Sequence, residues 1–75
     1  MALVNVVTLM MATHEAEKQS VDGRAIEIRL MPEGFLIFGH NGRKYSAVDI
    51  AWHAIDHRPE RMLINAVKAV AEKLG

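Results

Sequence analysis

The chain has no cysteine, which excludes disulfide bonds and thiolate-ligated zinc sites. It has no net charge either, because nine Lys and Arg residues balance nine Asp and Glu residues. That balance argues against a nonspecific nucleic-acid binder or a polybasic membrane binder, since both depend on an excess of positive charge. The fold must therefore be stabilised mainly by the packing of apolar side chains.

Long hydrophobic runs are also missing. Residues 1–12 are mostly apolar, but a membrane-spanning helix needs roughly 20 such residues. No basic segment precedes the run, as a secretory signal peptide would require. With 75 residues, of which 51% are hydrophobic, the composition predicts one small globular domain over residues 1–75 rather than a disordered chain. We expect a cytoplasmic location.

The N-terminal segment is compatible with two kinds of secondary structure. Branched residues such as Val4 and Val6 favour a strand. Periodicity favours a helix with a narrow solvent-exposed stripe made of Asn5, Thr8, Ala12, Glu15 and Gln19. We predict a helix over about residues 3–19 that ends before Asp22-Gly23. A strand over residues 3–10 followed by a short helix is the alternative.

Residues 25–48 predict a three-stranded antiparallel meander, with strands over about 25–31, 35–40 and 43–47. Met31-Pro32-Glu33-Gly34 fits a type I turn with a glycine bulge, and His40-Asn41-Gly42-Arg43 fits an Asn-Gly hairpin. In the register that these turns imply, the core face holds Ile26, Ile28, Leu30, Leu36, Phe38, Tyr45 and Ala47. The opposite face holds Glu27, Arg29, Met31, Phe35, Ile37, Lys44 and Ser46.

Two helices are predicted after the sheet. Residues 46–49, Ser-Ala-Val-Asp, resemble a capping box and predict a helix over about residues 47–57. Pro59 suits the first turn of a second helix over about 59–74. That helix would bury Leu63, Val67, Val70 and Leu74. The predicted fold class is therefore α+β, with an N-terminal helix, the meander and two C-terminal helices.

The strongest functional signal is a surface rather than a reaction centre. No nucleophile–base pair, carboxylate pair or cofactor-binding loop is recognisable, so we expect neither an enzyme nor a cofactor. The predicted second sheet face gathers Met31, Phe35 and Ile37, with Arg29 and Lys44 at its rim. Either the N-terminal helix covers this patch, or the patch is an interface with another protein. The leading hypothesis is a non-enzymatic protein-interaction module, a homodimeric regulator, inhibitor or assembly factor.

Two alternatives involve other residues. Arg43 and Lys44 at the hairpin tip could meet Arg58 and Arg61 at the helix junction and bind nucleic acid. The helix–three-strand–helix order is similar in layout to double-stranded-RNA-binding domains, but residues 46–49 stand where a lysine-rich helix start is expected.

The second alternative is a small metal site. His53 and His57 have the i,i+4 spacing with which two imidazoles on one helix hold a metal ion. The simpler interpretation is a solvated polar face, since such pairs are common on helices.

Overall fold

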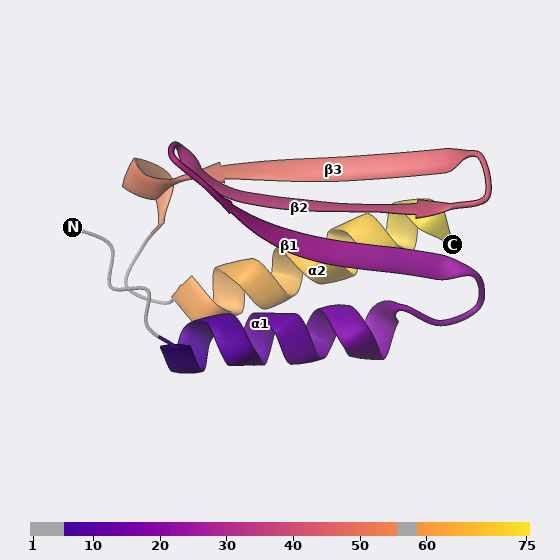
Figure 1. Cartoon of the computed structure of the whole chain (residues 1–75), viewed down its shortest axis with the longest axis horizontal. Helices are drawn as coiled ribbons and strands as arrows, with labels where there is room; N and C mark the ends of the chain where they lie inside the picture. Colours follow the sequence, from indigo (N-terminus) through magenta and orange to yellow (C-terminus); the bar gives the residue numbers. More distant parts are fainter. Residues whose placement is uncertain (1–5, 56–58) are drawn as a thin grey trace.

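The computed structural model of the protein describes residues 6–55 and 59–75. The elements follow in the order α1 (Val6–Gln19), β1 (Arg24–Met31), β2 (Gly34–Asn41), β3 (Lys44–Ala51), the short 3-10 helix η1 (Trp52–Ala54) and α2 (Pro59–Leu74). The strands form an antiparallel sheet in the order β1-β2-β3, and α1 and α2 lie side by side against the same face of it (Figure 1). The α+β class is confirmed, and the molecule has two layers.

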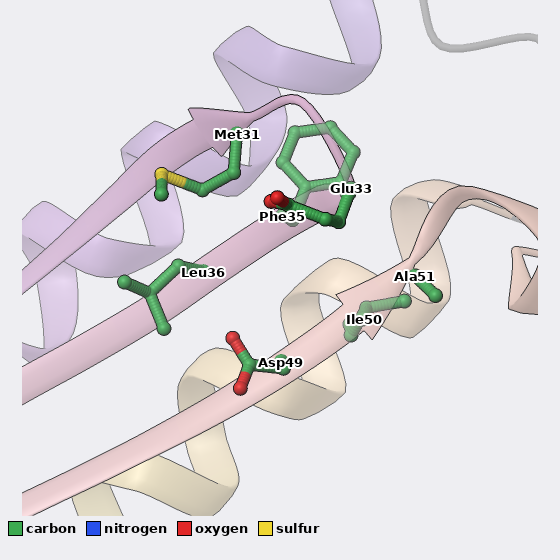
Figure 2. Close-up of a pocket in the computed structure, with 8 residues that line it drawn as sticks. Met31, Glu33, Phe35, Leu36, Asp49, Ile50 and Ala51 are labelled. Carbon is green, nitrogen blue, oxygen red and sulfur yellow. The ribbon is translucent and has the colours of Figure 1, made fainter.

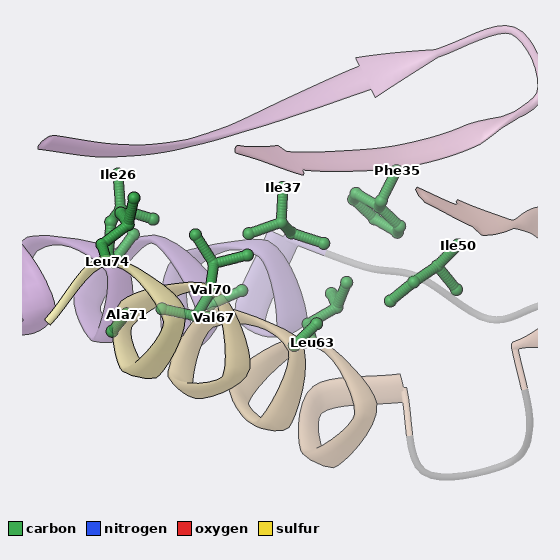
Figure 3. Close-up of a cluster of buried hydrophobic side chains, with 12 residues drawn as sticks. Ile26, Phe35, Ile37, Ile50, Leu63, Val67, Val70, Ala71 and Leu74 are labelled. Carbon is green, nitrogen blue, oxygen red and sulfur yellow. The ribbon is translucent and has the colours of Figure 1, made fainter. Parts of the chain in front are cut away.

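The core lies between the sheet and the helices (Figure 3). Helix α2 directs Leu63, Val67, Val70 and Leu74 toward the sheet, and all four are buried. Their spacing places one apolar side chain on the inner face at each turn. The predicted helix over 59–74 and its buried face are both confirmed. From the sheet, the central strand β2 contributes Phe35 and Ile37, which are 1% and 0% exposed.

Helix α1 is confirmed from Val6 onward, and residues 1–5 lie outside the described part of the chain. The predicted solvent-exposed stripe is wrong. Ala12 and Glu15 are buried, whereas Val7 and Met10 are 62% and 65% exposed. The reason is that α1 packs against both α2 and β1, and a small residue such as Ala12 lets backbones approach more closely than a methionine does.

The predicted strand pairing is wrong at both turns. Met31 pairs with Gly34 rather than Phe35, which shifts β2 by one residue against β1. A shift of one residue moves every side chain to the opposite face. Phe38 pairs with Ala47 rather than Tyr45, a shift of two residues that keeps the faces of β2 and β3 matched.

The faces of the sheet are therefore exchanged for two of the three strands. Ile26 and Ile28 of β1 do face the helices, as predicted. On β2 and β3, however, the side chains that face the helices are Phe35, Ile37, Ser46, Val48 and Ile50. Leu36, Phe38, Tyr45 and Ala47 point away from the helices, so their assignment to the core is wrong.

The predicted helix over residues 47–57 is also wrong. Strand β3 continues to Ala51, and η1 covers residues 52–54; residues 56–58 lie outside the described part of the chain. Ser46, Val48 and Ile50 alternate with exposed residues and face the helices, and every residue of β3 pairs with β2. Pairing along a whole neighbouring strand outweighs a local capping pattern, since strand preference depends on cross-strand neighbours.

Side-chain hydrogen bonds fasten the helices to the sheet. At the end of α1, the Ser20 hydroxyl donates to the Ala16 carbonyl at 2.7 Å and accepts from the Ile26 backbone N–H at 3.1 Å. At the end of α2, the Asn41 amide donates to the Leu74 carbonyl at 3.1 Å. Each bond satisfies a backbone group that a helix end or an edge strand leaves free, and together they hold one face of the sheet on the helices.

Candidate functional site

The face of the sheet that points away from the helices is named the open face, and no described helix covers it (Figure 1). Strand pairing arranges its side chains in rows that run from β1 through β2 to β3. In order from the Pro32-Glu33 turn, the rows are Met31–Gly34–Ala51, Arg29–Leu36–Asp49, Glu27–Phe38–Ala47 and Ala25–His40–Tyr45. All of these residues belong to the described part of the chain.

The centre of the open face is apolar and its sides carry charge. Leu36 and Phe38 of the central strand are half-buried although no described helix or strand lies over them. On the β1 side, the Arg29 guanidinium lies 3.8 Å from the Glu27 carboxylate and 5.2 Å from the centre of the Phe38 ring. On the β3 side, Asp49 is exposed. An apolar centre with a polar rim is the usual composition of a protein interface.

A hollow of about 350 Å³ opens between the first two rows (Figure 2). Gly34 forms its floor, between Met31 of β1 and Ala51 of β3. A side chain cannot replace this glycine, because an added Cβ would lie 2.0 Å from the Ile50 carbonyl oxygen. Met31 and Leu36 also line the hollow, together with the acidic residues Glu33 and Asp49, so its walls are mainly apolar and its rim is acidic.

Trp52 holds this end of the sheet in place. Its indole N–H donates to the Pro32 carbonyl at 2.8 Å, and its backbone N–H donates to the Glu33 carbonyl at 2.9 Å. Its ring meets Phe35 edge-to-face at 5.0 Å between ring centres, a favourable arrangement for two aromatic rings. The end of β3 is thereby tied to the turn between β1 and β2, which gives the hollow a fixed shape.

The residues of the predicted interface do not share one surface. Met31 and Arg29 lie on the open face, whereas Phe35 and Ile37 are buried in the core. Lys44 pairs with Asn41, whose side chain reaches α2 on the helix side, so alternation puts Lys44 on that side too. The open-face residues that the sequence analysis missed as surface are Leu36, Phe38, Tyr45 and Asp49. The alternation of Ser46, Val48 and Ile50 along β3 was the signal that could have revealed them.

The residues of the nucleic-acid alternative lie far apart. Arg43 and Lys44 are at the tip between β2 and β3, beside the C-terminal end of α2 (Figure 1). Arg61 is in the first turn of α2, at the opposite end of the molecule. Arg58 lies outside the described residues. The fold does not bring the tip to the start of α2, so these described cations form no joint phosphate clasp.

For the metal alternative, the described residues do not continue a helix beyond Ala54, where η1 ends, because Ile55 is extended. His53 lies in η1, while His57 lies outside the described residues. In residues 6–55 and 59–75, no three His, Asp or Glu side chains gather so that they could hold a metal ion.

A second apolar surface lies on the outer side of α1. Val7, Met10 and Met11 are exposed there, and together with Ile64 of α2 they line a hollow of about 460 Å³. We call these three residues the α1 ridge. Among the described residues, no helix is long and apolar enough to cross a membrane.

Comparison with known proteins finds no matching family model, no matching curated protein and no matching solved structure. The function must therefore be inferred from the geometry of the chain itself.

Proposed function

We propose that the protein is a non-enzymatic interaction module that binds a protein partner with the open face of its sheet and acts as a small regulator, inhibitor or assembly factor. The observation that supports this proposal most strongly is the strip formed by Leu36 and Phe38 in the centre of that face. A sheet in a two-layer domain needs only one apolar face for its own core. When a partner covers apolar side chains in the middle of the other face, the burial of their surface favours binding.

The charges of the open face favour a protein over a nucleic acid. The face carries Arg29 against Glu27 and Asp49. Phosphate binding depends on excess positive charge, so a face with more carboxylates than fixed cations repels a nucleic-acid backbone. A protein surface, by contrast, can present both apolar and charged partners to these groups.

The open face also suits the proposal better than the α1 ridge does. The open face has a structure that is fixed by strand pairing on both sides of β2. Contact residues that are already held in place lose less conformational entropy on binding.

Site-specific photo-crosslinking in the cells that produce the protein tests the proposal. A benzophenone amino acid replaces Tyr45, an aromatic residue of the open face that is 67% exposed. The same probe replaces Met10 of the α1 ridge and, as a control, the exposed Lys68 of α2. We expect one defined protein adduct from position 45, identified by mass spectrometry, and none from position 68. Adducts from position 10 alone would move the binding surface to the ridge and overturn the proposal.

A further inference from the structure

We infer that the partner of the open face is a second copy of this chain, packed face to face about a two-fold axis that runs parallel to β2. This inference rests on the proposed function, because it names the occupant of the same surface. It follows from the order of side chains in the rows of the open face.

A two-fold axis parallel to β2, midway between two such faces, lays β1 of one copy over β3 of the other, row upon row. Arg29 then lies opposite Asp49 of the second copy, and the symmetry repeats this pair on the other side of the axis. Aligned sheets pack at about 30° because of their twist. That rotation displaces the two outer rows most. The two central rows, one of which holds Arg29 and Asp49, stay nearly opposite the central rows of the second copy.

Side-chain size matches in the same arrangement. With the strands aligned, Met31 lies opposite Ala51 of the second copy and Ala25 lies opposite Tyr45, so each end of the face brings large side chains near small ones. Leu36 and Phe38 lie on the axis and meet their own counterparts, which forms an apolar centre. Pairing large with small side chains is what fills an interface at the density of a protein interior.

The other symmetric arrangement, with the axis perpendicular to the strands, fits less well. It lays β1 over β1 and puts Arg29 opposite Glu27 of the second copy, but Asp49 then faces Ala47. A carboxylate covered without a cation is strongly unfavourable. In the first arrangement Glu27 keeps its own Arg29 at 3.8 Å, and this arginine can bridge both carboxylates.

The area of the open face limits the size of the contact. Strands of this length give a face of roughly 26 by 14 Å, at about 3.3 Å per residue and about 4.8 Å per strand. Two such faces together measure about 730 Å², which is at the small end of protein interfaces and typical of weak, transient association. We therefore expect a reversible dimer with a dissociation constant in the micromolar range.

Charge reversal with mixing tests this geometry. In Arg29→Glu, the new carboxylate faces Asp49 of the second copy; in Asp49→Arg, the new guanidinium faces Arg29. Each variant alone should dimerise at least about tenfold more weakly than the wild type, because like charges oppose each other twice. An equal mixture should dimerise again, since the carboxylate introduced at position 29 of one variant then meets the guanidinium introduced at position 49 of the other. Lys68→Glu, on the exposed side of α2, is the matched control and should dimerise like the wild type.

Sedimentation equilibrium and native mass spectrometry measure the outcome, with circular dichroism to confirm that each variant is folded. Heterodimers that make up clearly more than the roughly one half of all dimers that random pairing gives would support the arrangement. If Asp49→Arg dimerises normally while Arg29→Glu does not, the perpendicular axis is correct instead. A wild-type chain that stays monomeric at high-micromolar concentration overturns the second copy as partner. A foreign adduct from position 45 in the crosslinking experiment would then leave the proposed function standing.

Discussion

Phe35 and Phe38 lie three residues apart on β2 and have opposite surroundings. Phe35 is 1% exposed and its ring contacts Trp52. Phe38 is half-buried on the open face, beneath the Arg29 guanidinium. Alternation along a strand explains the difference, because residues separated by an odd number of positions point to opposite faces. Similar side chains therefore serve the core in one case and the surface in the other.

Truncating each phenylalanine separates the two roles. Phe35→Ala should lower the free energy of unfolding by about 3–5 kcal/mol, because it leaves a cavity in the core. Phe38→Ala should lower it by about 1 kcal/mol, since it removes a partly exposed ring and a cation–π contact. Urea denaturation followed by circular dichroism measures both. Equal losses, or a larger loss for Phe38, would mean that the register predicted from the turns is right and that Phe38 belongs to the core.

Gly34 allows a second test at the scale of single residues. Its φ is 156°, and an added Cβ would lie 2.0 Å from the Ile50 carbonyl oxygen. Gly34→Ala should therefore cost about 2 kcal/mol or more, because the backbone of β2 or β3 must shift. Gly42, with φ of 62° and no atom within 4 Å of an added Cβ, is the control. Gly42→Ala should cost only about 1 kcal/mol, the strain of a left-handed backbone.

Thermal unfolding of the two glycine variants compares these costs directly. A Gly34→Ala protein as stable as Gly42→Ala would show that β2 and β3 do not approach as closely at this position as the structure has them.

Among the elements, α2 was the most predictable from the sequence. A proline at the first turn and apolar residues at regular helical spacing act together there, and both signals agree with its packing. The strands were predictable in number, order and approximate position, and so was the inward face of β1. Their register was not predictable. Residues 31–34 fit loops of two different lengths, and at the second turn a two-residue loop fits both residues 41–42 and residues 42–43.

The candidate site depended on that register. Because a shift of one residue exchanges the faces of β2 and β3, the sequence placed Phe35 and Ile37 on the surface and Leu36 and Phe38 in the core. Of the predicted interface, only Arg29 and Met31 lie on the open face. In α1, similarly, periodicity predicted the helix but not which side is buried. Small residues on the buried side resemble the residues of a solvent-exposed stripe when the neighbouring elements are unknown.

Enlarging or charging neighbouring residues of α1 tests which side is buried. Ala12 is 0% exposed, so Ala12→Leu should destabilise the protein by about 1–3 kcal/mol through overpacking. Met11 is exposed on the α1 ridge, so Met11→Lys should change stability by no more than about 0.5 kcal/mol. Chemical denaturation checks both values. The reverse order, with Met11→Lys the more damaging, would restore the orientation predicted from periodicity.

At the scale of the whole molecule, α1 and α2 cover one side of the sheet, and no element of residues 6–55 and 59–75 covers the other. A domain of 75 residues has a small core and gains little stability from it alone. Covering the open face with a second copy would enclose the sheet between two layers and extend the apolar core across the axis. Association would then contribute to stability as well as to function, so that thermal stability rises with protein concentration.

The measurement that tests the open face as the contact surface most directly is a dilution series followed by NMR, with chemical shifts recorded from low- to high-micromolar concentration. We predict that the largest changes fall on Arg29, Leu36, Phe38, Ala47 and Asp49, and that the outer sides of α1 and α2 change little. Changes centred on Val7, Met10 and Met11, with the open face unaffected, would contradict this prediction and place the contact on the α1 ridge.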